Sequence, residues 1–336
     1  MTRRPPSLVV ATLVVAALTI AACTGGTSPS PSARTPLVVG LGFIPSVQFA
    51  PFYLAEQEGW YADAGLDVSF QFTIDPDLVT LVGQGAIDVG SADGTSVIPA
   101  VSQGIPIRYV ATIYGQFPSI VFTRRSSGIT SAADLEGVRL GIPGRYGSSW
   151  IMLQALLGSA DLTPDDLEIV EYPDFGQGAA LAQGAVDAAT GFANNEPVQL
   201  ELSGVEAYVL YVDDTIALPG PGLIAGTATL DTKGDAIRAF VAATLRAMDE
   251  IAADPGRGLE AAIAAVPELA EQRETQLEIL RATVFTWQSP LTERDGFGTI
   301  DRDGWAASVA FMTDLGLVPN PVTVDALVSD DFLPAD

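Results

Sequence analysis

A short phrase that occurs once in each half of the chain limits its possible folds more than any other feature. The first copy is Gly85-Ala86-Ile87-Asp88-Val89-Gly90, and the second lies within residues 184–192. Each copy is typical of a short apolar strand that follows a short helix, predicted over residues 78–85 and 178–183. The repetition predicts two similar lobes, each built from βαβ units.

The rest of the chain alternates strands and helices in the same way. Further strands are predicted over residues 36–41, 66–72, 107–113, 167–171, 208–212 and 223–229. Helices are predicted over residues 53–60, 96–103, 151–157, 233–253, 258–266, 271–285 and 302–315, with Asp231 and Thr232 as the cap of the helix at 233. The pattern predicts an α/β protein of two lobes joined by crossing strands. The first lobe comprises residues 36–124 and 223–336, and the second comprises residues 125–222.

The first residues resemble a targeting segment. Two arginines precede an apolar run over residues 8–20, and Ile20-Ala21-Ala22-Cys23 matches the bacterial lipobox, which holds the only cysteine of the chain. Residues 1–22 are therefore predicted to be a lipoprotein signal peptide and Cys23 the lipidated residue, at the outer face of the cytoplasmic membrane. A plain signal peptide with an incidental cysteine is the alternative. The Ser-, Thr- and Pro-rich residues 23–35 are predicted to be a flexible tether.

Composition excludes several kinds of function. The chain has 41 acidic and 16 basic residues and a net charge of −25, so nucleic acid is not an expected partner. It has no histidine and one cysteine, which rules out Ser-His-Asp and Cys-His sites, the usual zinc sites and an internal disulfide. A site built from carboxylates alone stays open, but no EF-hand-like run occurs. We expect no metal site, no cofactor and no catalytic residue.

Candidate ligand-binding residues gather where predicted strands end, because ligands of open α/β sheets bind outside the carboxyl ends of strands. They are Phe43, Pro45, Gln48, Phe49, Ser91, Asp93, Tyr114, Gln116, Tyr146, Gly147, Ser148, Tyr172, Asn194 and Glu196. Trp287 and Gln288 could also reach the cleft, whereas Trp305 is expected in the core.

Each group of candidates has a structural alternative. The rings near residue 50, among them Phe52 and Tyr53, could cap the core instead of facing a ligand. Ser148 or Ser149 could be an ordinary helix N-cap, and Glu196 could simply favour a helix N-terminus. We favour ligand contact for Phe43, Gln48, Ser148 and Glu196.

Charge narrows the ligand. Arg108 and Arg145 are the only basic residues expected near the candidates, which disfavours nitrate or a sulfonate. Rings, amides and a carboxylate suit a flat, neutral or weakly basic heteroaromatic molecule.

Two phrases resemble those of a known family. Glu58-Gly59-Trp60-Tyr61-Ala62-Asp63-Ala64-Gly65-Leu66-Asp67-Val68, together with the preceding Phe-Ala-Pro-Phe-Tyr run, resembles ABC-transporter substrate-binding proteins of the NMT1/THI5-like branch. Residues 131–141 resemble the phrase that opens the second lobe in that family, and the resemblance extends from about residue 36 to 314. It implies a type II periplasmic-binding-protein fold, each lobe a mixed sheet flanked by helices, and a glutamate near Glu196 that pairs with an aminopyrimidine edge.

The sequence thus predicts the extracytoplasmic solute-binding component of an ABC importer. It would be a monomer that closes on a thiamine-pyrimidine or riboflavin type of ligand and delivers it to a permease. The family also implies alternatives: a binder of sulfonate or nitrate, a ligand-sensing lipoprotein, or a pyrimidine synthase. The synthase uses histidine and a cysteine-rich motif, and this chain has neither, so we do not expect an enzyme. The identity of the ligand, its affinity and the partner permease are not predicted.

Overall fold

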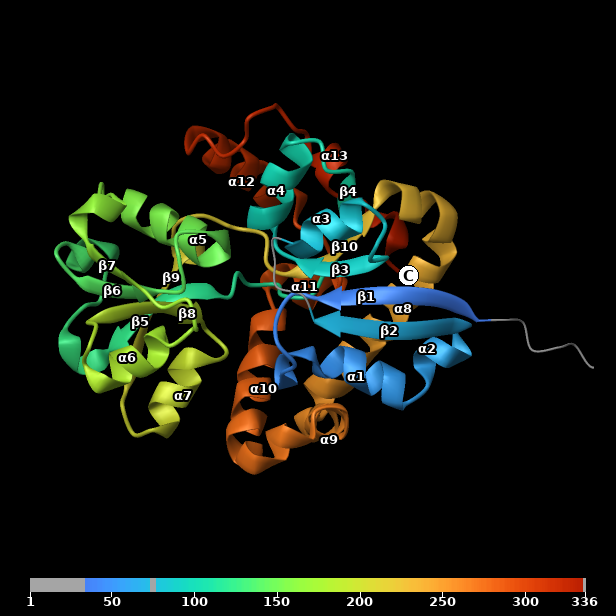
Figure 1. The fold of residues 1–336 in the computed structure, drawn as a ribbon, viewed down its shortest axis with the longest axis horizontal. Coiled ribbons are helices and arrows are strands. Elements are labelled where there is room, and N and C mark those ends of the chain that lie inside the picture. The colour runs from blue at the N-terminus through green and yellow to red at the C-terminus, as the bar shows by residue number, and fades with distance from the viewer. Residues whose placement is uncertain (1–33, 73–76, 335–336) are drawn as a thin grey trace, which may run out of the picture. The chain divides into compact units, whose positions relative to one another are not determined.

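The computed structural model describes residues 34–72 and 77–334, which form two mixed β-sheets flanked by helices (Figure 1). The predicted signal peptide, Cys23 and most of the predicted tether lie outside the described residues. Each sheet has five strands, in the orders β2-β1-β3-β10-β4 and β7-β6-β8-β5-β9. The first sheet comprises β1 (Thr35–Leu41), β2 (Leu66–Phe72), β3 (Val89–Ala92), β4 (Ile107–Thr112) and β10 (Gly222–Gly226). The second comprises β5 (Ser119–Arg124), β6 (Arg139–Ile142), β7 (Glu168–Glu171), β8 (Ala188–Phe192) and β9 (Ala207–Tyr211).

The two sheets share one topology. In each, three strands are parallel neighbours, and one strand that enters from the other lobe pairs antiparallel with the last of these three and with the fifth strand of the sheet. The entering strand is β10 in the first sheet and β5 in the second. The predicted two-lobed α/β architecture is therefore confirmed.

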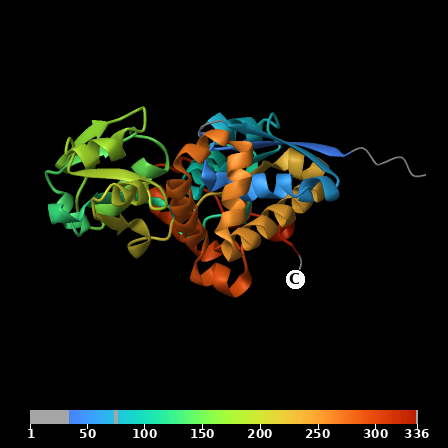
Figure 2. The same cartoon turned by 90° about the horizontal axis from the view of Figure 1, so that it is seen from below.

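Helices cover both faces of the first sheet, above and below it in Figure 1, and Figure 2 shows the lower helical layer from below. One face packs against α1 (Ala50–Gln57), α2 (Trp60–Asp63), α8 (Thr227–Ala253), α9 (Pro255–Ala265) and α10 (Arg273–Trp287). The other packs against α3 (Asp77–Gly83), α4 (Gly94–Ser102), α12 (Arg302–Asp314) and α13 (Val324–Leu327), and α11 (Pro290–Asp295) follows α10. Phe240 of α8 stacks on Tyr61 at 4.9 Å between ring centroids, which fixes α8 to α2 within the core.

The second sheet has its own two layers. One face packs against α5 (Gly147–Gly158), and the other against α6 (Gln177–Gln183) and α7 (Glu196–Leu202). Short 3₁₀ helices complete the chain: Val47–Phe49, Arg125–Ser127, Ala132–Leu135, Pro164–Asp166, Val212–Asp214, Pro267–Gln272 and Asp330–Phe332. Within the described part of the chain, no helix is both long and apolar enough to cross a bilayer.

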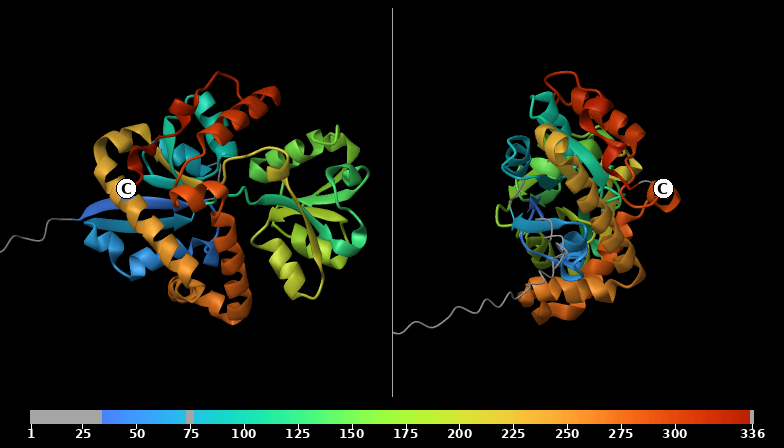
Figure 3. Two further views of the ribbon diagram at one scale, coloured as in Figure 1. Left: turned by 180° about the vertical axis from the view of Figure 1, so that it is seen from behind. Right: turned by 90° about the vertical axis from the view of Figure 1, so that its right-hand side faces the viewer.

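The chain passes between the sheets twice, at residues 113–118 and 215–221 (Figure 3). The predicted first boundary at residue 124 was wrong, because β5 (Ser119–Arg124) belongs to the second sheet. No strand was predicted over residues 119–124, so the sequence pattern gave no basis for assigning this segment to either sheet. The backbone N–H of Phe117, in the first crossing, donates to the carboxylate of Asp213, just before the second crossing, at 3.0 Å. The two connections between the lobes are therefore hydrogen-bonded to each other at this point.

The start of α8 also differs from the prediction. The predicted strand 223–229 ends at Gly226, and the helix begins at Thr227 rather than at residue 233. Lys233 leaves the helical conformation (φ −123°, ψ 20°), which kinks α8. Thr232 does not cap a helix there, because its hydroxyl donates to the Ala228 carbonyl one turn earlier at 2.8 Å. The sequence pattern found only the part of the helix that follows the kink.

Candidate ligand-binding cleft

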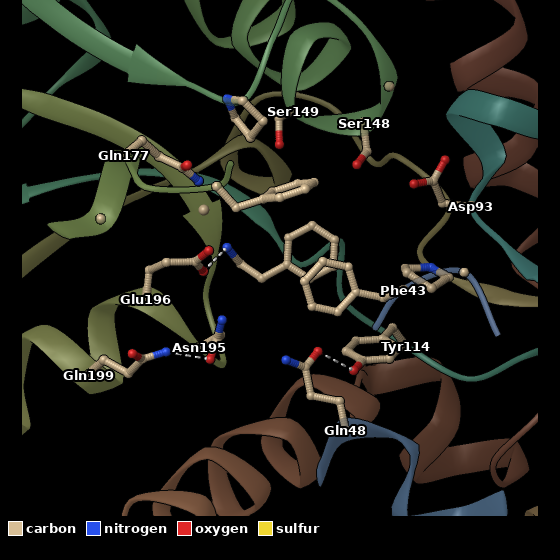
Figure 4. A pocket seen from close by; sticks show the side chains of 18 of the residues that line it. Phe43, Gln48, Asp93, Tyr114, Ser148, Ser149, Gln177, Asn195, Glu196 and Gln199 are labelled. Carbon is tan, nitrogen blue, oxygen red and sulfur yellow. Dashed lines mark hydrogen bonds between the residues drawn. The ribbon is translucent and has the colours of Figure 1, made fainter. Parts of the chain in front are cut away.

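Residues from both lobes line a cavity of about 540 Å³. Its walls include the segments that follow β1, β3, β4, β6, β7 and β8, together with residues of α6 and α7. The volume falls within the range of sites that bury a small organic ligand. Ten of the residues predicted from sequence line it: Phe43, Gln48, Phe49, Ser91, Asp93, Tyr114, Tyr146, Gly147, Ser148 and Glu196 (Figure 4).

The other four predicted residues do not line the cavity. Pro45 is exposed to solvent. The Gln116 amide donates to the carbonyls of Phe285 and Gln288, at 3.2 and 2.9 Å, and so ties the first crossing to the end of α10. The prediction of these two residues as ligand contacts is therefore corrected: Pro45 faces solvent, and the Gln116 amide bonds backbone carbonyls.

Tyr172 packs in the core of the second lobe, and Asn194 contacts the first lobe. The Tyr172 ring packs against the core cluster beneath α6 and α7. Asn194 is fully buried, and its amide donates to the Thr283 hydroxyl of α10 at 2.8 Å. Asn195, the next residue, is the one that faces the cavity. Trp287 is fully buried in the core of the first lobe rather than in the cleft, and Trp305 is buried as expected.

Several lining residues were not among the predicted site residues. Ser149, Phe175, Gln177, Asn195 and Gln199 line the cavity from the second lobe. Figure 4 shows the Ser149 hydroxyl facing the cavity, whereas the Gln177 amide is buried and donates to the Thr190 carbonyl at 3.1 Å. Phe175 lies three residues after the predicted Tyr172, and Asn195 lies between the predicted Asn194 and Glu196. Gln177 and Gln199 lie on helices, where the strand-end rule gives no signal.

Two pairs of side chains connect elements across the cavity walls. Phe43 follows β1 and Phe175 follows β7, and their rings meet edge to face with centroids 5.7 Å apart and an interplanar angle of 86°. The Tyr114 hydroxyl lies 3.5 Å from Gln48 Oε1, which orients the amide beside the rings. The cleft thus offers aromatic surface from both lobes and an amide edge from the first.

The N-terminus of α5 opens onto the cavity. Its N-cap is Tyr146, whose side chain accepts no hydrogen bond from the first turn. Ser148 and Ser149 lie inside that turn, so neither is the N-cap considered from the sequence. Ser149 instead lies 3.3 Å from the Ser119 hydroxyl. The free N–H groups of a first turn are suited to a ligand carbonyl or anion.

Each lobe contributes one carboxyl group to the cavity. Asp93 caps α4, accepting from Thr95 Oγ1 at 2.6 Å and from the Ser96 N–H at 3.0 Å. Glu196 opens α7 and accepts from the Phe192 N–H at 2.8 Å. Burial raises the pKa of both carboxyls, with the hydrogen bonds opposing it. Glu196 thus lies in the first turn of α7, as the structural alternative expected, and it also lines the cavity.

No arginine or lysine is among the residues that line this cavity in the described part of the chain. Arg145 pairs with Glu171 at 3.4 Å and lies over the Trp150 ring. Arg108 donates to the backbone carbonyls of Asp325 and Val328, away from the cleft. Over residues 34–72 and 77–334, no group of three or more acidic or cysteine side chains is placed to hold a metal ion.

Two α/β lobes with one shared topology, two crossings and a cleft between them define the periplasmic-binding-protein fold. The sequence profile described as NMT1/THI5 like matches residues 46–257. The chain therefore belongs to the NMT1/THI5-like family, as its sequence phrases indicated.

The chain is similar to characterised members of this class along most of its length. It is 32% identical over 314 residues to the riboflavin-binding protein RibY of Chloroflexus aurantiacus, covering 91% of this chain and 89% of that protein. It is 26% identical to a formylaminopyrimidine-binding protein of Halalkalibacterium halodurans, covering 90% and 92%. Among solved structures, the alkanesulfonate-binding protein SsuA of Xanthomonas axonopodis pv. citri superposes with a TM-score of 0.68 at 18% identity, covering 89% and 99%. At that identity the likeness concerns the fold alone.

Proposed function

We propose that this protein is the solute-binding component of an ABC importer, and that its cleft takes a flat heteroaromatic vitamin or precursor. Riboflavin and a thiamine-type pyrimidine are the two ligand types considered. The observation that carries the proposal is a cavity with aromatic rings from both lobes, amide groups and carboxyls, and no basic side chain among its described lining residues. The similarity to a riboflavin-binding protein and a formylaminopyrimidine-binding protein supports the same ligand class.

Each kind of lining group has a part in this function. The rings of Phe43 and Phe49 supply faces for a planar guest. The Gln48 amide and the first turn of α5, with Ser148, supply polar contacts for its edge. A guest that touches both lobes favours the closed arrangement, and a permease can recognise that arrangement as the loaded state.

Glu196 is the side chain most suited to a donor on the guest. One of its oxygens already accepts from the Phe192 N–H, and the carboxyl faces the cavity. Replacing it with alanine should weaken binding by about 2 kcal/mol, because a buried polar group on the guest then loses its partner. Isothermal calorimetry of the Glu196→Ala variant against the identified ligand measures this, and an unchanged affinity would remove Glu196 from the site.

The ligand class is tested by direct binding. Native mass spectrometry of the purified protein shows whatever molecule it carries. Titration with riboflavin, followed by quenching of flavin fluorescence, and calorimetry with formylaminopyrimidine test the two types. Taurine, a sulfonate, is the matched anionic probe. Binding of taurine with no binding of either heteroaromatic molecule would contradict the proposal.

A binding role also predicts that the guest is returned unchanged. The chain has no histidine and a single cysteine, Cys23, so Ser-His-Asp and Cys-His sites of common hydrolytic enzymes cannot be assembled. Chromatography of riboflavin and formylaminopyrimidine after prolonged incubation should show both intact. A new product that depends on the protein would favour an enzyme instead.

We further propose that Cys23 anchors the protein to the outer face of the cytoplasmic membrane, where a monomer delivers its ligand to a permease. The lipobox phrase and the single cysteine support this. Membrane fractionation of Cys23→Ser should find the protein released from the membrane fraction. Retention equal to that of the wild type would contradict lipidation.

A further inference from the structure

The backbone of Phe175 adopts a conformation that its side chain disfavours. Its φ is +60°, and among the described residues the only other non-glycine residue with positive φ is Asp161, at +57°. A β-carbon clashes with the neighbouring carbonyl oxygen in this region, so glycine, and less often asparagine or aspartate, is usual there. A bulky aromatic residue in this conformation is a true outlier.

The local turn does not need the ring. The Phe175 N–H closes the turn by donating to the Tyr172 carbonyl at 2.9 Å, a bond that any residue other than proline can make. The Asp174 carboxylate then accepts from the Gly176 N–H at 3.2 Å and leads the chain into α6. Glycine is the favoured residue at the fourth position of such turns. Local structure alone therefore gives no reason for phenylalanine here.

The ring is directed into the cleft. Phe175 lines the cavity, its side chain is 40% exposed, and its ring meets that of Phe43 from the other lobe. In the protein without a ligand, Phe175 is unfavourable in two ways: its backbone conformation is strained, and its large apolar ring is exposed to solvent. Strained residues of this kind gather at ligand sites, where the surrounding structure holds them for function.

We infer that Phe175 is a ligand-contacting residue, and that it and Phe43 are the paired aromatic surfaces, one from each lobe, that a planar guest meets. The left-handed backbone at residue 175 is what aims the ring at Phe43. This inference rests on the proposed function for the planar shape of the guest. It adds the residue of the second lobe that recognises that shape, which the strand-end analysis did not include.

The experiment separates the ring from the strain. Phe175→Gly removes both the ring and the conformational conflict, so its melting temperature should equal or exceed that of the wild type. Its affinity for riboflavin, measured by fluorescence quenching, should fall at least tenfold, about the loss expected for one stacking ring and its buried surface. Phe175→Tyr keeps the ring and should bind within about threefold of the wild type.

Asp161→Gly is the matched control, because it relieves the other positive-φ residue at an exposed position that does not line the cavity. It should keep or raise the melting temperature and leave riboflavin affinity within about twofold. Phe43→Ala should lose affinity to a similar degree as Phe175→Gly, and the double variant should lose less than the product of the two losses, because both rings contact one guest.

The outcomes distinguish the two claims. If the wild type binds neither riboflavin nor formylaminopyrimidine, the proposed function fails. If the wild type binds riboflavin and Phe175→Gly binds it equally well, the inference fails while the function stands. A melting temperature of Phe175→Gly several degrees below that of the wild type would also overturn the inference, since the ring would then be serving the stability of the lobe.

Discussion

In each lobe an aspartate fixes the third parallel strand by two hydrogen bonds to the backbone. The two lobes differ in which residue neutralises the charge of that aspartate. Asp88 precedes β3 and Asp187 precedes β8, at matching places in the repeated phrase. The Asp88 N–H donates to the Val38 carbonyl at 2.9 Å, and its carboxylate accepts from the Val38 N–H at 2.9 Å. Asp187 makes the same two bonds with the backbone of Arg139, at 2.9 and 3.4 Å. Each aspartate therefore holds its strand against the first of the three parallel strands of its sheet, β1 in the first lobe and β6 in the second.

The counterions come from different distances along the chain. In the second lobe, the guanidinium of Arg139 itself pairs with Asp187 at 3.0 Å, so one residue of β6 supplies both backbone and charge. In the first lobe, the ammonium of Lys233 bonds both carboxylate oxygens of Asp88, at 2.9 and 3.0 Å, and the Pro36 carbonyl at 3.0 Å. Lys233 lies at the kink of α8, after the second crossing. The ion pair of Asp88 therefore requires a residue of α8, whereas the ion pair of Asp187 forms within residues 119–211.

Burial makes the first pair the more important one. The Asp88 and Lys233 side chains are 11% and 31% exposed, against 37% and 41% for Asp187 and Arg139. Breaking a buried pair leaves a charge without compensation, whereas a half-exposed charge recovers water. The repeated phrase supplies the aspartate that fixes the strand, but it does not determine which residue neutralises that aspartate.

The largest expected effect follows from removing the only lysine. Lys233→Met should lower the free energy of unfolding by about 3 kcal/mol, the low end of the cost of breaking a buried pair, since Lys233 is partly exposed. Urea denaturation at pH 7 measures it. Asp88→Asn in the Lys233→Met background should recover part of the loss, because no charge is then stranded. Arg281→Met, which removes an exposed pair with Glu278, is the control and should cost less than about 0.5 kcal/mol.

The equivalent change in the second lobe should matter much less. Arg139→Met should cost about 0.5 kcal/mol at pH 7, because Asp187 keeps contact with solvent. The Arg139 hydrogen bond lowers the pKa of the Asp187 carboxyl. A carboxyl with a lowered pKa contributes stability above its unfolded pKa of about 3.9 and loses it as the pH falls through the folded value. The deficit of Arg139→Met should therefore be present at pH 7 and shrink below about pH 4. A loss as large as that of Lys233→Met would contradict the contrast between the lobes.

Much of this organisation could be predicted from the sequence. The repeated phrase predicted two similar lobes, and apolar runs bounded by turns predicted most strands and helices. The strand β5 was not predicted, and hydrophobic periodicity carries no information about strand partners that could have placed it in the second sheet. Hydrophobic periodicity did not predict the kink at Lys233 either, nor that the Lys233 ammonium bonds a carboxylate 145 residues earlier in the chain.

The site shows the same limit at the level of single side chains. Strand ends predicted which segments reach the cleft, but not which way each side chain points. Asn194 turns toward Thr283 of α10 while its neighbour Asn195 faces the cavity. Gln116 was predicted as a ligand contact, yet its amide is used by the carbonyls at the end of α10. Phe175 requires a left-handed backbone that sequence patterns assign to glycine, so no propensity would have aimed its ring at Phe43.

The smallest expected effect lies where the two lobes join, at Asp213. Its carboxylate, just before the second crossing, accepts from the Phe117 N–H in the first. Burial raises the pKa of Asp213 to about 6, although part of the residue stays exposed to solvent. A carboxyl with a raised pKa contributes stability that is complete below its unfolded pKa of about 3.9 and is lost as the pH rises through the folded value. Solvent contact should limit this loss to about 0.5 kcal/mol between pH 4 and pH 8.

Asp213→Asn keeps an acceptor for the Phe117 N–H and removes the titration. Its free energy of unfolding should equal that of the wild type near pH 4 and exceed it slightly at pH 8, as measured by urea denaturation at both values. Asp165→Asn, at an exposed position outside the crossings, should show no such change between the two pH values. If Asp213→Asn is instead less stable than the wild type at pH 8, the ionised carboxylate is a net support of the crossings. Asp213 would then resemble Asp88 of the first lobe, whose carboxylate also accepts from a backbone N–H. In both, a charge-assisted hydrogen bond would outweigh the cost of burying the carboxylate.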